Sequence, residues 1–216
     1  MLISLNWIQQ YLPTIDQVDA LDVAEKLSNS LAEVEKVYRV GEGVSNIVVG
    51  EILSIEEHPN ADKLSVCQVK VADEVTKQII CGAKNIQEGD KVPVCLPGGS
   101  VLDPEGSLGN QKSYQITEKE LKGINSFGML CSPKELGIYD DHKGIMILNP
   151  NSPIGRDLSP DIKDTVLEIE NKSLTHRSDC FSHIGIAREI AAIYNLEFQP
   201  EEKPSTLTKT ADLDFR

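Results

Sequence analysis

Short strand-like runs separated by turn-forming residues fill the middle of this 216-residue chain and constrain its fold more than any other feature. The connectors, such as His58–Asp62 and Pro97–Gly99, are rich in proline, glycine, asparagine and aspartate. Several short strands joined in this way are typical of a small closed or partly open β-barrel. Ser132 and Glu135 have the spacing of a capping box and predict one short helix in the same region. The strand-like runs are Ile47 to Ile55, Leu64 to Val71, Val75 to Cys81, Lys91 to Leu96, Tyr114 to Ile116 and Ile145 to Leu148.

The first 40 residues predict two short helices and a strand. Ser4 can cap a helix that ends before Pro13, and either Asp16 or Asp19 can cap the second helix. The segment 34–40 alternates between apolar and polar residues like a half-buried strand. Because so short a segment cannot enclose a core of its own, we expect it to dock on another part of the protein.

The segment after the barrel begins with a strand at 166–170 and continues into a helix that Ser178 or Asp179 can cap. One strand and one helix do not complete a core, so this segment is interpreted as the opening of a larger, truncated domain. The fold class is therefore α+β and mainly β. The expected domains are an N-terminal helical docking segment (1–40), the central barrel (41–155) and the start of a third domain (156–216).

Acidic residues outnumber basic ones along the whole chain. The net charge is −13, and it divides into −4 for residues 1–44, −4 for 45–156 and −5 for 157–216. A simple nucleic-acid binder normally carries a basic face, so any contact with phosphate here must come from a local patch. The sequence has neither a signal-peptide pattern at its start nor an apolar run long enough to cross a bilayer. We therefore expect a soluble, cytoplasmic protein with no membrane contact.

The cysteines do not have the spacing of a metal site. They are odd in number and widely separated, and none forms the CxxC pair from which zinc ligands are usually drawn. We interpret them as small apolar side chains that fill strands, and we expect no metal. They are Cys67, Cys81, Cys95, Cys131 and Cys180.

One short stretch concentrates reactive residue types: His176, Arg177, Asp179, Cys180 and His183. A cysteine near a histidine can be a nucleophile, with the aspartate orienting the base. The stretch can equally be a capped helix start in which the aspartate interacts with the helix dipole and the cysteine is buried. Nothing nearby completes a triad or an oxyanion hole, so we favour the second interpretation and expect no catalytic residue. P-loop and dinucleotide-binding patterns are also missing from the sequence.

The barrel region carries a specific resemblance. The stretch His58–Leu64, followed by Ile79–Ile86, resembles the tRNA-binding OB-fold module shared by several synthetase-associated proteins. The continuation also fits this module at Gly89–Val94, Leu121–Ser132 and Glu135–Gly137. The resemblance implies an OB-fold barrel that binds tRNA across one face.

The flanks resemble a narrower family, the bacterial phenylalanyl-tRNA synthetase β subunits. The similarity is carried by Ser4–Ile8 and Leu31–Val37 before the barrel, and by Leu167–Glu170, Thr175–Cys180 and Gly185–Ala192 after it. In that family a Pro-Asn pair usually precedes the arginine, whereas here Leu174-Thr175-His176 stands before Arg177. Since the family's subunit is several times longer, we interpret this chain as an N-terminal fragment that ends inside the editing-domain region.

The resemblance implies a division of labour. The whole enzyme attaches phenylalanine to its tRNA as an α2β2 assembly, with ATP and Mg2+ bound by the partner α subunit. This fragment is then expected to be non-catalytic and without a cofactor of its own, with tRNA and the α subunit as its partners. The alternatives are a free-standing OB-fold tRNA-binding or chaperone-like protein, and a protein-interaction module that docks a subunit through strand edges and helices.

Lysines along the barrel are the candidates for gripping an RNA backbone. With asparagines as hydrogen-bonding groups, they supply contacts to phosphate that do not depend on sequence. Aromatic residues for base stacking are few, with Tyr114, Phe127 and Tyr139 in this region. The connector His58–Asp62 has in addition a structural explanation, as a rigid link between two strands. The candidate residues are Asn60, Lys63, Lys70, Lys77, Lys84, Asn85 and Lys91.

Overall fold

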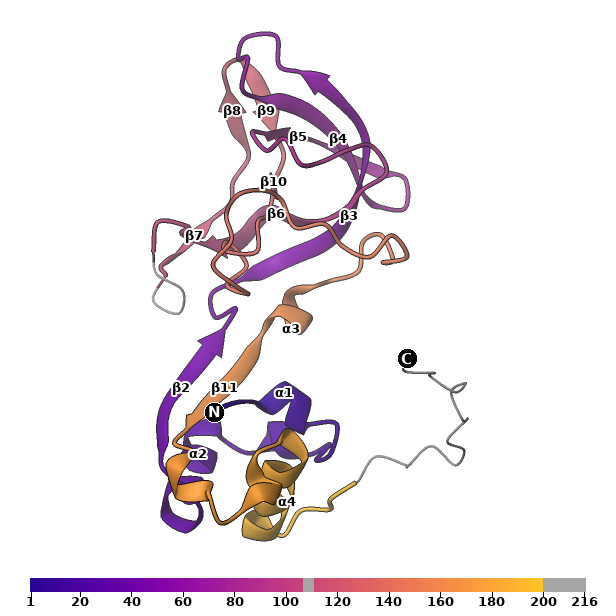
Figure 1. Cartoon of the computed structure of the whole chain (residues 1–216). Helices are drawn as coiled ribbons and strands as arrows, with labels where there is room; N and C mark the ends of the chain where they lie inside the picture. Colours follow the sequence, from indigo (N-terminus) through magenta and orange to yellow (C-terminus); the bar gives the residue numbers. More distant parts are fainter. Residues whose placement is uncertain (107–110, 200–216) are drawn as a thin grey trace, which may run out of the picture. The chain divides into compact units, whose positions relative to one another are not determined.

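The computed structural model describes residues 1–106 and 111–199, which form two compact units (Figure 1). Unit 1 combines Met1–Val37 with the described residues from Thr165 onward, and unit 2 is Tyr38–Asp164. Residues 200–216, which belong to the expected third domain, lie outside the described part of the chain. Among the described helices, none has the length and apolar character needed to cross a membrane.

Unit 2 is built on one antiparallel sheet of six strands, which confirms the expectation of a mainly β region. The strands pair in the order β10-β6-β3-β4-β5, and β7 pairs with β6. A separate hairpin is formed by β8 and β9. The strands are β3 (Ser45–Glu57), β4 (Ser65–Ala72), β5 (Val75–Cys81), β6 (Lys91–Leu102), β7 (Ser113–Gln115), β8 (Lys119–Leu121), β9 (Ile124–Ser126) and β10 (Met129–Leu130).

The described strands of unit 2 do not close into a barrel, because the pairing path ends at β5 and at β10. The edge of β5 is nevertheless bonded to the segment that leads into β10. Phe127 N donates to Gln78 O over 2.8 Å, and Ile80 N donates to the hydroxyl of Ser126 over 3.0 Å. A serine hydroxyl thus replaces a backbone acceptor at this edge, so the regular ladder stops there.

The core of unit 2 follows the two-residue period of its strands. On β4 the side chains of Cys67, Val69 and Val71 are buried together, while the alternate residues face away from this core. Gly50 on β3 permits close packing, since a Cβ there would lie 2.5 Å from a methyl of Val94. All five cysteines are buried with free thiols. Cys67, Cys81 and Cys95 lie on strands as expected, whereas Cys131 follows β10 and Cys180 lies in a 3-10 turn of unit 1.

Unit 1 joins the two ends of the described chain in one core. Its sheet has the order β1-β11-β2, so β11 (Asp164–Ile169) is the central strand. β1 (Leu2–Ser4) pairs antiparallel with it, with Ile3 opposite Leu167. We expected residues 1–40 and 156–216 to belong to different domains, but the structure places most of both in unit 1. The physical reason is burial, because Ile8, Leu27, Leu167 and Ile186 pack in one cluster.

The helices of unit 1 begin close to the expected positions but not always at them. Ser4 caps α1 (Leu5–Ile8) by accepting a hydrogen bond from Trp7 N, although α1 is shorter than predicted. Asp19 is the N-cap position of α2 (Ala20–Ser30). The last helix, α4 (His183–Tyr194), is capped by Ser182, whereas Ser178 and Asp179 lie in a preceding 3-10 turn, η3 (Ser178–Cys180). The remaining elements are η1 (Ile15–Gln17), β2 (Val34–Val40), α3 (Ser159–Ile162) and η2 (Lys172–Leu174).

The helix predicted at Ser132 does not form. Glu135 N does donate to the Ser132 hydroxyl, and Glu135 in turn accepts from Ser132 N, so the capping box itself is present. The residues that follow form turns, and Gly137 has a φ of 72°. A left-handed residue so soon after the cap ends the turn before a helix can grow.

Candidate nucleic-acid interface

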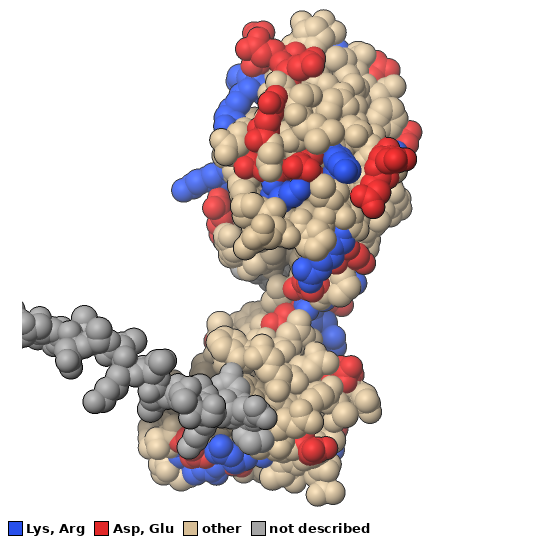
Figure 2. All heavy atoms as spheres, turned by 90° about the vertical axis from the view of Figure 1, so that its right-hand side faces the viewer, with Lys and Arg blue, Asp and Glu red and all other residues tan. Residues whose placement is uncertain are grey.

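The predicted lysines are spread over unit 2 and differ in exposure. Lys63, in the turn between β3 and β4, and Lys84, in the loop after β5, are fully exposed. Lys70, Lys77 and Lys91 lie on strands and are partly buried. Figure 2 shows one face of the molecule, on which basic and acidic side chains are interspersed. Phosphate contacts would therefore be local, as the net charge requires.

The strand lysines have neighbours that limit what they can do. Lys91 on β6 forms an ion pair with Glu51 on β3 over 3.1 Å, and its side chain is only 11% exposed. Glu51 is also the register partner of Lys70 on β4. Lys70 itself makes no ion pair with a described residue. The ammonium of Lys77 lies 5.9 Å from the ring centroid of Phe127. Lys70 is therefore the strand lysine with the most freedom to meet a phosphate.

The connector after β3 is held against the β8–β9 hairpin. His58 is 5% exposed; its Nδ1 accepts from Asn60 N at 3.1 Å, so its proton is on Nε2, which lies 3.1 Å from Leu121 O. The side-chain amide of Asn60 donates to Lys122 O over 2.9 Å. Asn60 thus fastens two connectors together, which gives its amide nitrogen a structural role.

The hydrogen bond from Asn60 involves Lys122, a residue that was not among the candidates from the sequence. It is exposed and stands beside Gly123 at the tip of the β8–β9 hairpin, with φ values of 51° and 89°. Two consecutive positive φ values are those of a type I′ turn. A Lys-Gly pair between two short strand-like runs was the signal that could have identified this tip.

Asn85 fastens a second pair of segments. Its Nδ2 donates to Ile145 O over 2.8 Å, and its Oδ1 accepts from Ile145 N over 3.0 Å. Gly144 makes this fit possible, since a Cβ there would lie 2.5 Å from the Asn85 side chain. The clamp holds the backbone at Lys84 close to that at Lys143, a second exposed lysine that was missed. Because 58 residues lie between these two lysines in the sequence, no local pattern predicts that they come together.

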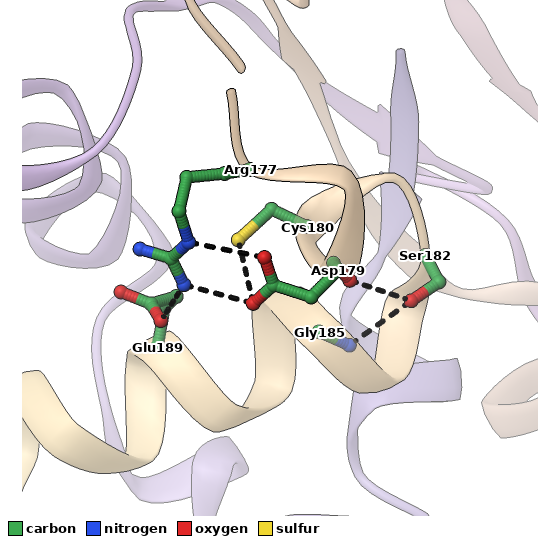
Figure 3. A network of polar contacts seen from close by, with 6 residues as sticks. All are labelled: Arg177, Asp179, Cys180, Ser182, Gly185 and Glu189. Atoms are coloured by element: carbon green, nitrogen blue, oxygen red, sulfur yellow. Dashed lines mark hydrogen bonds and ion pairs between the residues drawn. The ribbon is translucent and has the colours of Figure 1, made fainter. Parts of the chain in front are cut away.

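The cluster of reactive residue types in unit 1 is an internal ion-pair network (Figure 3). The guanidinium of Arg177 donates to both oxygens of Asp179, at 3.0 and 2.9 Å, and to Glu189 at 2.5 Å. These hydrogen bonds raise the pKa of Arg177, and the bond from Arg177 lowers the pKa of Asp179 to about 2. The network joins the turn at η3 to helix α4.

Neither a nucleophile nor a metal fits this network well. Burial raises the pKa of the Cys180 thiol, which disfavours the thiolate that a nucleophile needs. Asp179, Cys180 and Glu189 are the one group of potential metal ligands among the described residues. Both carboxylates already accept hydrogen bonds from Arg177, so a cation would have to compete with the guanidinium for them.

The two histidines of that stretch do not join the network. His176 is exposed. The ring of His183 stacks on Trp7 with centroids 4.3 Å apart, and its Nε2 accepts from Ser4 N at 3.1 Å. His183 therefore joins β1 to the start of α4, which is a structural contact.

Comparison with known proteins gives the family. The sequence family described as "Putative tRNA binding domain" matches residues 47–157. The phenylalanine–tRNA ligase β subunit of Syntrophus aciditrophicus is 46% identical over 196 residues, which cover 89% of this chain and 22% of that protein. The corresponding subunit of Fusobacterium nucleatum is 41% identical and is covered to 23%.

A solved structure, the C-terminal domain of Plasmodium vivax p43, is 25% identical with a TM-score of 0.35, over 52% of this chain and 58% of that one. The chain spans less than a quarter of the length of the curated relatives named above. It belongs to the putative tRNA-binding domain family, and over most of its length it is homologous to phenylalanine–tRNA ligase β subunits.

Proposed function

We propose that this chain is the tRNA-binding and architectural part of a phenylalanine–tRNA ligase β subunit, and that it is not a catalyst on its own. One observation carries the proposal: similarity to β subunits extends over 89% of the chain and so includes unit 1 as well as residues 47–157. A free-standing tRNA-binding protein would need only unit 2. The resemblance of the flanks therefore favours the subunit over that alternative.

Within this proposal unit 2 is an OB-fold whose open edge is bridged by hydrogen bonds from the segment before β10. RNA would follow the exposed cations of its connectors, Lys63 with Lys122 and Lys84 with Lys143, and Lys70 on the strands between them. Lys77 and Lys91 would contribute less, because an aromatic ring and a carboxylate already engage them. Asn60 and Asn85 would act by positioning the lysines rather than by binding phosphate.

The remaining parts of the proposal concern the whole enzyme. Phenylalanine activation, with ATP and Mg2+, would belong to a partner α subunit in an α2β2 assembly, in the cytoplasm. Residues 156–216 would lead into an editing-type domain. The role of unit 1 would be architectural, in keeping with a polar network that is satisfied internally.

The lysines can be tested by measuring the affinity for tRNA by fluorescence anisotropy at about 50 and about 200 mM salt. The double variant Lys63→Ala, Lys84→Ala should weaken binding about tenfold and reduce the slope of log K against log salt by about 2, since each phosphate contact contributes about one unit. A matched control replaces two exposed lysines of unit 1, Lys36→Ala and Lys172→Ala, and should leave both quantities unchanged. Equal losses in the two double variants would contradict the proposed interface.

A purely protein-binding role is the second candidate, favoured by the net charge of −13 and by apolar side chains exposed on unit 1. Leu2, Trp7 and Phe181 are 59%, 52% and 46% exposed. Co-purification with the α subunit separates the candidates. Capture of that subunit together with an absence of salt-dependent tRNA binding would favour the docking role alone.

A further inference from the structure

A hollow of about 360 Å³ opens in unit 2 between the end of β5, β10 and the segment 142–145. Its size is that of a small-ligand site. One part of its lining is apolar, from Ile80, Leu130 and Ile145, and another part is polar, from Ser132, Glu135 and His142. A planar ligand with an apolar face and a polar edge fits such a combination.

In the polar part of the hollow, the hydrogen bonds determine which groups donate and which accept. Glu135, which is 7% exposed, receives both the backbone N–H and the hydroxyl of Ser132 at one oxygen, Oε2, at 2.7 Å each. The Ser132 hydroxyl has a single proton, so its 2.9 Å contact with His142 Nδ1 requires that the ring donates there. A neutral His142 is then left with Nε2 as an acceptor. No described residue donates to the second oxygen of Glu135.

The cations lie at the rim of the same hollow. Lys143 is among the lining residues, and Lys84 directly follows the lining residue Ala83. The Asn85 clamp to Ile145 holds the two segments together at this place. A ligand in the hollow would therefore have its negatively charged part near two lysines and its polar edge near two acceptors.

We propose that this hollow binds one unpaired nucleobase that carries an exocyclic amino group, with the attached phosphate at Lys84 and Lys143. The inference rests on the proposed function, because the base would belong to the bound tRNA. Guanine, adenine and cytosine present amino donors to the carboxylate and to His142 Nε2. Uracil has no amino group: its edge offers one donor, N3–H, between two carbonyl oxygens, so at least one acceptor of the hollow would face a carbonyl oxygen. Recognition of a splayed-out base at its polar edge is the usual way in which proteins read single-stranded RNA.

The direct test uses the unaltered protein and mononucleotides. Amide chemical shifts are followed by NMR while guanosine or uridine monophosphate is added. Guanosine monophosphate should shift the signals of Ala83, Ser132 and Gly144 and bind about tenfold more tightly than uridine monophosphate, the discrimination expected of a good polar pairing. Equal binding of both nucleotides, or shifts confined to Lys84 and Lys143, would show a phosphate site only and would overturn the inference.

Two variants add an independent test. Glu135→Gln removes the carboxylate, and His142→Ala leaves the capping box intact if the first variant fails to fold. Each should abolish the preference for guanosine over uridine monophosphate, whereas Glu57→Gln, an exposed carboxylate on β3, should keep it. Salt-dependent tRNA binding without any nucleotide preference would overturn the inference and leave the proposed function standing. Nucleotide preference without tRNA binding would overturn the proposed function, and with it tRNA as the source of the base.

Discussion

The two units of this protein differ in how the chain builds their cores: unit 2 uses one continuous stretch, and unit 1 uses two stretches that lie far apart in the sequence. In unit 2, β3, β4 and β5 pair in sequence order, while β6 returns to β3 and β10 returns to β6 over longer connections. Unit 1 is assembled from two stretches that residues 38–164 separate. Its central strand, β11, comes from the later stretch and is flanked by β1 and β2 from the earlier one. Half of such a unit has no core, so neither stretch can fold without the other.

The units also use their polar groups differently. In unit 1 Arg177 is satisfied by two carboxylates of the same unit, and the network holds a turn against a helix. In unit 2 two asparagines fasten connectors to one another, while the lysines beside them point to no described partner. The comparison teaches that the network around Arg177 stabilises the first unit. In the second unit Asn60 and Asn85 hold connectors that carry exposed lysines, and under the proposed function these lysines would meet RNA.

The largest effect is expected from Gly185→Ala in α4. The new Cβ would lie 1.8 Å from the carbonyl oxygen of Asp179, which is backbone and cannot give way. We expect unit 1 to lose about 3 kcal/mol or more of stability, at or above the usual limit for overpacking. Trp7 is the sole tryptophan and lies in unit 1, so urea unfolding followed by its fluorescence measures the loss.

Gly82→Ala in unit 2 is the matched control for Gly185→Ala. Its Cβ would meet no atom closer than 3.6 Å, so the substitution should change stability by less than about 0.5 kcal/mol. If the two variants unfolded at the same urea concentration, the close contact at Gly185 would not exist as described.

Leu167→Ala tests whether the two stretches of unit 1 share one core. Leu167 on β11 is completely buried in the cluster that also holds Ile3 and Ile8. Removing it should cost about 3 kcal/mol, within the range for leucine in a core. Val166→Ala, a half-buried neighbour on the opposite face of the strand, should cost clearly less in the same urea measurement. Equal costs would mean that β11 does not carry the core.

Asn85→Ala tests the positioning role proposed for unit 2. The variant loses two hydrogen bonds to Ile145, which should lower the stability of unit 2 by about 1 to 2 kcal/mol. It should also weaken tRNA binding, because Lys84 and Lys143 are no longer held together. Thermal unfolding and anisotropy give the two values. Asn29→Ala, which changes an exposed helical asparagine of unit 1, should leave tRNA binding unchanged. If this variant also weakened tRNA binding, the loss in Asn85→Ala would not be evidence that Asn85 positions the two lysines.

Much of unit 2 could be predicted because its signals are local. The alternation on β4 and the turn residues at 58–62 depend on residues a few positions apart, and both β4 and this connector are present. Two local predictions were wrong: the run at 145–148 forms no strand, and Pro97–Gly99 lies within β6 and not in a connector. The cysteines were predictable as core residues for the same reason. The absence of a helix after Ser132 could not be predicted, because a capping box followed by a closing glycine at Gly137 is a pattern of short helices, and only the structure shows turns between them.

The arrangement of unit 1 could not be predicted from local patterns. Nothing in the sequence indicates that Ile3 lies opposite Leu167, since a pairing over so many residues leaves no periodicity. The cap of α4 was expected at Ser178 or Asp179, a few residues early, because serine and aspartate are both good caps and only the hydrogen bond from Gly185 N distinguishes Ser182. Lys143 was missed for a similar reason, since its place depends on the contact of its neighbours with the distant Asn85, whereas Lys122 had a local signal in the Lys-Gly pair.

The smallest expected effect concerns acid. In unit 1 the pKa of Asp179 is lowered to about 2 by Arg177, and hydrogen bonds also lower the pKa values of Asp22 and Glu170. Asp157 is the one carboxyl of the described part of unit 2 whose pKa is clearly lowered. A lowered pKa in the folded state gives stability above the unfolded value, 3.8 for aspartate, which is lost as the pH falls towards about 2. Acid should therefore weaken unit 1 more than unit 2.

Arg177→Gln makes this prediction specific. It removes the first cause of the low pKa of Asp179, so the fall in the urea midpoint between pH 4 and about 2, followed at Trp7, should become shallower than in the unaltered protein. The variant should already be less stable at neutral pH, because the carboxylates then lack their partner. Since Asp179 is exposed and Asp22 and Glu170 are only partly buried, solvent screening keeps the effect modest. An unchanged acid profile would mean that Arg177 bridges η3 to α4 without contributing to the stability of unit 1, and the contrast between the units would then rest on their cores alone.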